Sequence, residues 1–336
     1  MRAAQPTVAC LGEPLALVAP ERLDLVPAPG EAGLSGAEAN VAVGLAGSGV
    51  PVGYVGRVGA DAAGRDVVTA LEQAGVDVSA LGVDPQRPTG RFTKVVTPDA
   101  SGEPSTVADY RRAGSAFSAA GPELLVDPAV RDLLGGARLV HCSGITPALS
   151  PQCAALMDAL VGERRGVAGQ VSFDVNWREK LWPSGDPSEV VRLAGLADLV
   201  LVGADEAERV LGESDPARLR ALLPEPELLV IKDADRRAVA VGRDGTQTEV
   251  PALRVEVVEA VGAGDSFAAG FLHGWLAGEH LQTCLRRGHI GAAATLTVHG
   301  DFARARADVV RRLLAADHEQ WAGIRFTGAD VLEPVG

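Results

Sequence analysis

The fold is decided by a stretch in the second half of the chain, LVLVGADEAERVL at residues 199–211, and by the apolar run LLVI at residues 228–231. Strands of a parallel sheet that are buried on both faces read as continuous Val, Leu and Ile, as both runs do. Between them, residues 204–211 are a candidate helix. A strand, a helix and a second buried strand in this order are typical of a parallel sheet covered by helices.

The same alternation of strands and helices extends in both directions from this stretch. Candidate strands lie at residues 52–55, 139–142, 171–174, 199–202, 228–231 and 238–241, and candidate helices at residues 37–46, 63–74, 151–161, 204–211 and 266–277. Five or more strands separated by helices favour an α/β fold with a doubly wound, mainly parallel sheet over an all-β fold or a helical bundle.

Two stretches do not fit this rhythm. Residues 14–35 and 90–112 are rich in Pro, Gly and alternating residues, and residues 91–97 are the clearest strand within them. Ordinary surface loops of this length would be unusual in a compact domain. We expect instead that both stretches form one small β-sheet that projects as a lid, and that residues 324–336 form a loosely attached tail.

Composition limits the possible partners. The 336 residues carry 31 basic and 44 acidic side chains, a formal net charge of −13, which argues against a surface that binds nucleic acid or an anionic membrane. No apolar run approaches the roughly 18 residues of a membrane-spanning helix. The four cysteines stand far apart without a CxxC pair, and the first residues do not read as a signal peptide. We therefore expect a cytoplasmic protein that binds neither nucleic acid nor membrane.

The segment VGAGDSFAAG at residues 261–270 carries the chemistry. Small residues before a helix let consecutive backbone N–H groups point at one anion, and the helix dipole adds attraction. Asp265 falls in the first turn of the predicted helix, where its carboxylate could accept a proton from an attacking hydroxyl. Phosphoryl transfer needs both an anion site and such a base. The simpler interpretation is a Gly-rich turn in which Asp265 only caps the helix.

Other catalytic motifs are missing, and two signatures identify a resemblance. The chain has no GxxxxGK[ST] P-loop, GxSxG elbow or HExxH helix. It has SGAEANVAVGLA at residues 35–46, then VGRVGAD at residues 55–61 and Gly64, and far downstream the GAGD segment. In this order they resemble the PfkB (ribokinase-like) carbohydrate kinases over nearly the whole chain. The resemblance implies a ribokinase-like kinase domain over residues 1–323, a homodimer through the lid, and ATP and Mg²⁺ as cofactors.

Finer matches are similar to one subgroup, the 2-keto-3-deoxygluconate kinases. These matches are YRRAGSA at residues 110–116, SGITPAL at residues 143–149 and FDVNWREKLW at residues 173–182. A sugar acid needs a partner for its carboxylate, and Arg offers bidentate geometry. The resemblance implies a catalytic group of Asp265, Gly262, Ala263 and Gly264, and a substrate group of Gly36, Asn40, Phe92, Tyr110, Arg112 and Arg178. Phe92 stands where the subgroup often has Tyr.

The nucleotide side departs from the family pattern. The family's DTTGAGD reads EAVGAGD at residues 259–265, and its KxGxxG stretch reads KDADRR at residues 232–237. Its NxxE motif has Gly203 in place of Asn but keeps Glu206, and His289 replaces an Asn near the expected adenine pocket. The resemblance still implies that Lys232 and His289 bind nucleotide and that Glu206 holds Mg²⁺ through water. The added carboxylates at residues 233 and 235 would repel phosphates if they faced the site.

Three functional interpretations follow from these observations. The first is an ATP-dependent kinase that phosphorylates a hydroxyl of a keto sugar acid such as 2-keto-3-deoxygluconate. The second is a catalytically weak or inactive relative that binds a sugar acid as a sensor or interaction protein, and the third is a kinase for a neutral sugar or nucleoside. The retained Asp265 favours an active kinase, because substitutions that accumulate in an inactive kinase should spare this residue no more than its neighbours.

Overall fold

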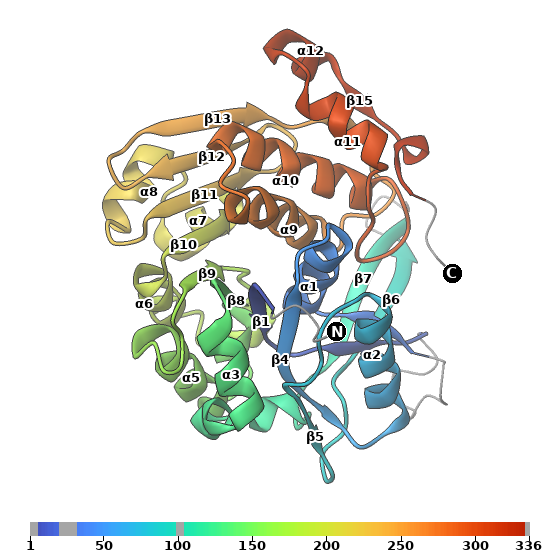
Figure 1. Ribbon diagram of the computed structural model, residues 1–336, viewed down its shortest axis with the longest axis vertical. Helices are drawn as coiled ribbons and strands as arrows, with labels where there is room; N and C mark the ends of the chain where they lie inside the picture. The colour runs from blue at the N-terminus through green and yellow to red at the C-terminus, as the bar shows by residue number, and fades with distance from the viewer. Residues whose placement is uncertain (1–5, 20–31, 99–103, 333–336) are drawn as a thin grey trace.

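One sheet of nine strands forms the centre of the molecule (Figure 1). The computed structural model describes residues 6–19, 32–98 and 104–332. The strand order is β13-β12-β11-β10-β9-β8-β1-β4-β5. The strands are β1 (Val8–Leu11), β4 (Val52–Gly59), β5 (Leu81–Asp84), β8 (Leu139–Ser143), β9 (Gln170–Asp174), β10 (Leu199–Gly203), β11 (Leu228–Asp233), β12 (Arg237–Gly242) and β13 (Gln247–Pro251). Strands β11 through β5 pair in parallel, whereas β12 and β13 are antiparallel.

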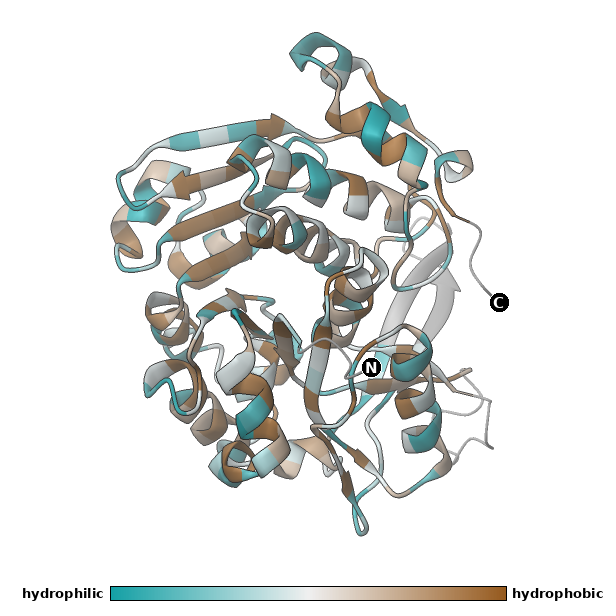
Figure 2. Ribbon diagram, viewed as in Figure 1, coloured by the Kyte–Doolittle hydropathy of each residue, from teal (hydrophilic) through white to brown (hydrophobic). Residues whose placement is uncertain are grey.

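Helices cover both faces of this sheet. One face carries α1 (Ala37–Gly47), α2 (Ala62–Gln73), α9 (Ala263–Leu276), α10 (Leu281–Leu296) and α11 (Ala307–Leu314), and the other α3 (Pro128–Gly136), α5 (Pro151–Met157), α6 (Ser188–Leu196), α7 (Ala204–Leu211) and α8 (Pro216–Leu222). Leu199 and Leu201 of β10 point into the first core, and Val200 and Val202 into the second. This explains why the strand is apolar throughout, as Figure 2 shows for the central strands.

The described parts of residues 14–35 and 90–112 form one small sheet, as expected, whereas residues 20–31 and 99–103 lie outside the described residues. Its order is β3-β2-β6-β7, with β2 (Leu15–Leu17) and β3 (Gly33–Ser35) from the first stretch and β6 (Arg91–Pro98) and β7 (Pro104–Arg111) from the second. Helix α1 begins directly after β3, with Gly36 at its N-cap. The lid is therefore joined to the helix that carries Asn40.

The described part of the expected tail, residues 324–332, is packed against the domain, whereas residues 333–336 lie outside the described residues. Strand β15 (Arg325–Phe326) pairs in parallel with β14 (Arg254–Val255), and Val331 forms a bridge with Ala305. The Phe326 side chain is buried in the same core as α10. Burial of an aromatic side chain fixes the segment although it holds little regular structure.

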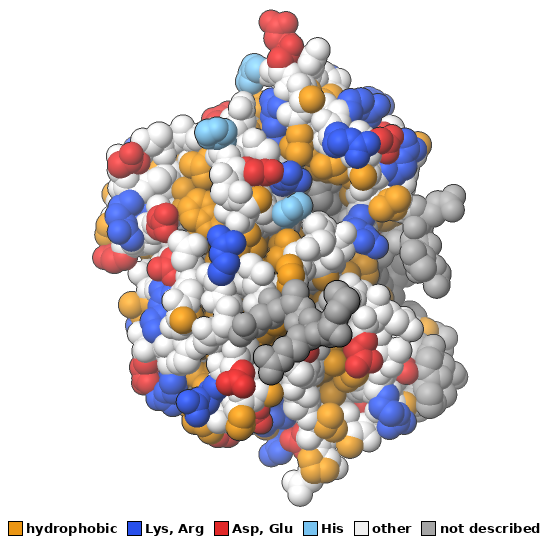
Figure 3. Space-filling model, in the orientation of Figure 1, with side chains coloured by type: hydrophobic (Ala, Val, Ile, Leu, Met, Phe, Trp, Pro, Cys, Tyr) orange, Lys and Arg blue, Asp and Glu red, His pale blue; other side chains and the backbone are white. Residues whose placement is uncertain are grey.

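Three further features bear on the expectations from sequence. The predicted helix at residues 151–161 changes to a π-helical turn after α5, at Asp158–Gly162. In the described part of the chain, no helix is long and apolar enough to cross a membrane. Acidic and basic side chains are interspersed over the face shown in Figure 3, so the net charge does not gather into one patch on that face.

Candidate active site

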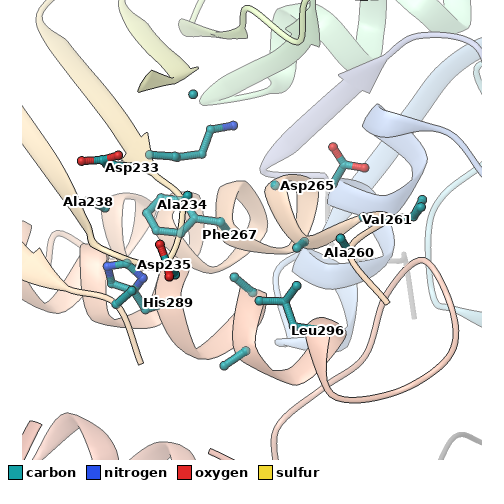
Figure 4. Close-up of a pocket in the computed structure, with 18 of the residues that line it drawn as sticks. Asp233, Ala234, Asp235, Ala238, Ala260, Val261, Asp265, Phe267, His289 and Leu296 are labelled. Atoms are coloured by element: carbon teal, nitrogen blue, oxygen red, sulfur yellow. The ribbon is translucent and has the colours of Figure 1, made fainter. Parts of the chain in front are cut away.

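A cavity of about 630 Å³ opens where the carboxyl ends of β9, β10 and β11 face the first turn of α9. Nine of the residues singled out from the sequence line it, namely Tyr110, Arg178, Glu206, Lys232, Gly262, Ala263, Gly264, Asp265 and His289. Tyr110 and Arg178 line the same cavity as His289 and Leu296, and in Figure 4 Asp265 and His289 lie on opposite sides of it. Ligands of open α/β sheets bind at this edge, beyond the carboxyl ends of the strands.

The first turn of α9 presents backbone N–H groups to the cavity. Gly262 is its N-cap with φ of 82°, and a Cβ atom there would lie 1.8 Å from the carbonyl oxygen of Asp301. Only glycine fits this position, because the conformation is left-handed and the space is already filled. Ala263, Gly264 and Asp265 are the first residues of the helix, so their N–H groups have no acceptor within the helix, and Ala263 N–H makes only a long hydrogen bond of 3.4 Å to the Ala260 carbonyl oxygen. All three line the cavity.

Asp265 lies in the cavity with its carboxylate held from one side. Asn40 Nδ2 donates a hydrogen bond of 2.8 Å to Asp265 Oδ2. Helix α1 reaches α9 because the contact is made by small residues, and a Cβ on Gly44 would lie 2.7 Å from Ala269 Cβ. Burial raises the pKa of Asp265 to about 6, and the Asp174 carboxylate adds to this rise, whereas the Asn40 hydrogen bond and the nearby cations oppose it. A carboxylate with this pKa is suited to accept a proton near neutral pH.

Lys232 brings a positive charge to the same turn. Its Nζ is bonded to Asp174 Oδ2 at 2.7 Å and lies 3.7 Å from where a Cβ on Gly264 would stand. Burial lowers the pKa of Lys232, but the carboxylates of Asp174, Glu206 and Asp265 outweigh burial, so the pKa is raised and the ammonium stays charged. The sequence identified Lys232 but not Asp174, which stands at the end of β9 in the FDVN stretch.

Arg178 and Glu206 face each other across the cavity mouth. Arg178 Nη1 lies 3.4 Å from Glu206 Oε1, and the Arg178 side chain is about half exposed. Glu206 Oε2 accepts a hydrogen bond of 2.9 Å from the Gly203 N–H, which caps helix α7. The indoles of Trp177 and Trp182 stack on each other at 5.2 Å, so Arg178 is left to the cavity.

Four of the expected substrate residues lie behind the cavity wall, namely Gly36, Asn40, Phe92 and Arg112. Phe92 is fully buried and stacks on Tyr110 at 4.8 Å, so it supports that ring and does not present its own face to a ligand. Arg112 lies over the other side of the Tyr110 ring and donates a 2.7 Å hydrogen bond to the buried Glu13. No local sequence pattern singles out Glu13, because a partner 99 residues away along the chain depends on tertiary packing.

The residues that differ from the family pattern on the nucleotide side are accommodated by local contacts or backbone conformation. Ala234 adopts a φ of 42° where the family pattern has glycine, so the turn keeps a left-handed shape despite its side chain. Asp233 is paired with Arg236 at 2.6 Å and lies 3.8 Å from Arg237, which offsets its charge. Glu259 Oε2 accepts a hydrogen bond from the Gly300 N–H at 3.2 Å, and Glu259 does not line the cavity.

The chain is similar to known carbohydrate kinases. A model of the pfkB family carbohydrate kinases matches residues 15–306. The chain belongs to the PfkB family. It is 33% identical over 283 residues to the 2-dehydro-3-deoxygluconokinase of Bacillus subtilis (strain 168), covering 80% of this chain and 82% of that protein. It is 31% identical over 285 residues to the 2-dehydro-3-deoxygalactonokinase of Haloferax volcanii, covering 83% and 87%.

A solved structure extends the comparison to the fold. The PfkB protein from Polaromonas sp. JS666 superimposes with a TM-score of 0.74 at 30% identity, covering 93% of this chain and 100% of that chain. The ribokinase-like fold expected from the sequence is thereby confirmed. Within the described residues, no group of three or more His, Cys, Asp or Glu side chains could hold a metal ion by itself. Any divalent ion in a PfkB site of this kind must take further ligands from phosphates and water.

Proposed function

We propose that this protein transfers the γ-phosphate of ATP to a hydroxyl of a keto sugar acid, with 2-keto-3-deoxygluconate as the first candidate. The observation that carries the proposal is the Asp265 carboxylate, with its pKa raised to about 6, at the N-terminus of α9 in a cavity that also contains Arg178 and Lys232. The two relatives described above are named for sugar acids of this class, which supports the choice of substrate.

The reaction requires a base and an anion site on one turn of helix. The Asp265 carboxylate accepts the proton of the substrate hydroxyl as its oxygen attacks the γ-phosphorus. The new P–O bond forms while the bond from the γ-phosphorus to the bridging oxygen breaks, and ADP leaves with that electron pair. The N–H groups of Gly262, Ala263 and Gly264 donate to the oxygens of the transferring group, and Lys232 adds a positive charge there.

Arg178 is the proposed partner of the substrate carboxylate. It lines the cavity and keeps donors beyond its contact with Glu206, and a guanidinium binds a carboxylate through two parallel hydrogen bonds. Tyr110, between Phe92 and Arg112, forms the adjoining wall. In this arrangement Arg112 positions the Tyr110 ring and contributes its charge from behind, and Gly36 and Asn40 shape the start of α1.

Glu206 fits a role in holding Mg²⁺ through water. Its Oε2 is fixed by the Gly203 N–H, whereas Oε1 has only the 3.4 Å contact with Arg178. Mg²⁺ in sites of this kind takes one or two carboxylates and otherwise binds phosphates and water. When bound, the ion would neutralise part of the charge on the phosphates.

A coupled assay of ADP production tests the proposal. We expect turnover with 2-keto-3-deoxygluconate and related sugar acids, weak or no turnover with neutral sugars, and a loss of about 10²–10⁴ in kcat for Asp265→Asn. Equal turnover by Asp265→Asn would refute the base assignment. Binding of a sugar acid in calorimetry, without any response to MgATP or turnover, would replace the kinase by the sensor interpretation.

Arg178→Ala separates a sugar-acid kinase from a kinase for neutral sugars. We expect KM for the sugar acid to rise by roughly 10-fold or more, since a charged hydrogen-bonded pair is removed, and KM for any neutral substrate to change little. Lys180→Ala is the matched control, because Lys180 is an exposed cation only two residues after Arg178 in the chain. A parallel rise for acidic and neutral substrates would contradict the sugar-acid assignment.

We propose a homodimer formed through the lid, in the cytoplasm. Among the described strands, β7 is an edge of the four-stranded lid sheet, and open edges favour pairing with a second chain.

The four cysteines are free and buried, which suits a reducing compartment. Light scattering on the purified protein distinguishes a dimer from a monomer.

A further inference from the structure

A second cavity, of about 440 Å³, lies between α1, α9, α10 and α11. These four helices lie next to one another on one face of the central sheet (Figure 1). The cavity shares no lining residue with the active-site cavity. Its volume is in the range of small-molecule sites. It is therefore a separate candidate site.

The charge of this cavity is opposite to that of the whole chain. Arg287, Arg304 and Arg311 line it, and among the described residues no Asp or Glu does so. The chain carries a formal net charge of −13, and the active-site cavity is lined by carboxylates such as Asp265 and Glu206. A concave surface with charges of one sign concentrates ligands of the other sign. The second cavity thus favours an anion.

Two of the three arginines keep hydrogen-bond donors for a ligand. Arg287 is held by Glu279, to which its Nε and Nη2 donate at 2.5 and 2.6 Å. Arg304 Nη1 donates a 3.0 Å hydrogen bond to the carbonyl oxygen of Gly47, and its guanidinium carbon lies 3.0 Å from where a Cβ on Gly47 would stand. Because Gly47 also lines the cavity, this guanidinium lies at the cavity wall. Arg311 has no side-chain hydrogen bond or ion pair within the part of the chain that the structure describes.

Arg311 lies on the face of α11 that is turned to the cavity. The residues of α11 that line the cavity are Ala307, Val310, Arg311 and Leu314. Their spacing of three and four residues places them on one face of the helix. Arg312 does not line the cavity, and it pairs with Asp330 at 3.4 Å instead.

Apolar side chains beside these cations are left uncovered. Phe302 is 37% exposed and Leu332 is 46% exposed, and both line the cavity. Figure 3 shows hydrophobic and basic side chains next to one another over α11. Exposed apolar surface that adjoins polar groups marks a binding site. A ligand that satisfies this cavity carries an anionic group on an apolar body.

We propose that this cavity is an effector site for a phosphate ester with an apolar body. Arg304 and Arg311 hold the phosphate, and Phe302 and Leu332 cover the body. Two guanidinium groups with free donors favour a dianionic phosphate over a single carboxylate. Since no carboxylate lines the cavity to act as a base, the ligand is bound there and not converted.

The floor of the cavity connects this site to the catalytic helices. Gly44 of α1 and Ser266 and Ala269 of α9 line it. A Cβ on Gly44 would lie 2.7 Å from Ala269 Cβ, so the two helices are in direct contact there. Ser266 follows Asp265, and Gly44 is one turn after Asn40, which donates a hydrogen bond to Asp265. A ligand that shifts α1 against α9 therefore changes the start of α9, and the affinity for nucleotide should change with it.

Phenyl phosphate is the probe, because it carries a phosphate on an apolar ring. Calorimetric titration of the full chain in saturating MgADP should show one bound phenyl phosphate. Inorganic phosphate and phenol should each bind at least about tenfold more weakly, since each lacks one half of the recognised group. Arg311→Gln should weaken binding of phenyl phosphate about tenfold. Arg312→Gln is the matched control on the neighbouring residue and should leave the affinity unchanged.

Three results would overturn the effector site. They are loss of phenyl phosphate binding in saturating MgADP, equal affinities in Arg311→Gln and Arg312→Gln, and binding of benzoate as tight as that of phenyl phosphate. Coupling is measured by titrating MgADP with and without phenyl phosphate. We expect at least about a twofold change in its dissociation constant, and an unchanged constant would refute the effector role. None of these measurements requires phosphorylation of a sugar, so this inference and the proposed function can fail separately.

Discussion

Asp265 must be ionised to act as a base, yet the cavity disfavours its charge. Because burial raises its pKa from the ordinary 3.8 to about 6, we expect kcat/KM to rise with pH through about 6 and to level off above 7. A pH series of initial rates measures this limb. Glu206→Gln should reduce the rate without moving the acidic limb of the pH–rate profile, since Glu206 only holds the metal in our proposal. A limb near pH 4 would contradict the raised pKa.

The same shift has a consequence for stability. A carboxyl whose native pKa lies above its unfolded value prefers to be protonated in the native state, so its ionised form destabilises the fold above pH 6 and has no effect below about 4. We expect Asp265→Asn to raise the free energy of unfolding by about 1–3 kcal/mol at pH 8 and by much less at pH 4. Urea unfolding at both pH values measures the difference. An equal change at both would show that ionisation is not the cause.

Asn40 acts through Asp265. Its amide stabilises the ionised carboxylate through the 2.8 Å hydrogen bond, which opposes the rise in the pKa. We expect Asn40→Ala to move the acidic limb of the pH–rate profile to higher pH while much of the rate at pH 8.5 is retained, and Asn40→Asp to move it further through repulsion between like charges. A lower rate with an unmoved limb would mean that Asn40 contacts the substrate.

At the scale of an element, the N-terminus of α9 depends on Gly262. Gly262→Ala would place a Cβ 1.8 Å from a backbone oxygen, in a left-handed conformation. We expect a loss of about 3 kcal/mol or more in stability, with loss of nucleotide binding, because the turn must shift. Gly278→Ala, after the end of the same helix, is the matched control. Gly278 has a φ of 70° and nothing within 4 Å, so only strain of about 1 kcal/mol is expected and activity should persist. Similar losses in both variants would contradict the role of the close contact.

Elements were predictable from sequence where pattern and packing agree. Helix α7 begins and ends at the expected residues, because a Gly on each side bounds a strongly amphipathic run. Strand β1 lies inside the sheet, between β8 and β4, but is not predicted from the sequence, since VACL is short and its Ala and Cys weaken the β signal. The contacts of Asn40 with Asp265 and of Lys232 with Asp174 join segments far apart in the chain, and no local pattern specifies such a meeting.

The whole molecule shows why the C-terminal segment was misread. Residues 325–331 have the composition of a tail, yet Phe326 is 1% exposed and shares a core with Trp321, against which His289 packs. Strand β15 also pairs with β14, whose Val255 lines the cavity. The last part of the chain thus packs behind residues that line the cavity, and a defect there should reach the site.

We therefore expect Phe326→Ala to weaken binding of nucleotide more than binding of sugar acid. Truncating a buried aromatic side chain costs roughly 3–5 kcal/mol, which should lower the urea midpoint, and loosening of β14 should raise the dissociation constant for ATP several-fold. Leu332→Ala is the control, since Leu332 is 46% exposed and its truncation should change stability by less than about 0.5 kcal/mol. Equal urea midpoints for the two variants would mean that this segment is part of the loosely attached tail expected from the sequence at residues 324–336. A selective loss of nucleotide binding would instead make this segment a support of the nucleotide site, because the proposed sugar-acid residues Arg178 and Tyr110 lie outside β14, the strand with which the segment pairs.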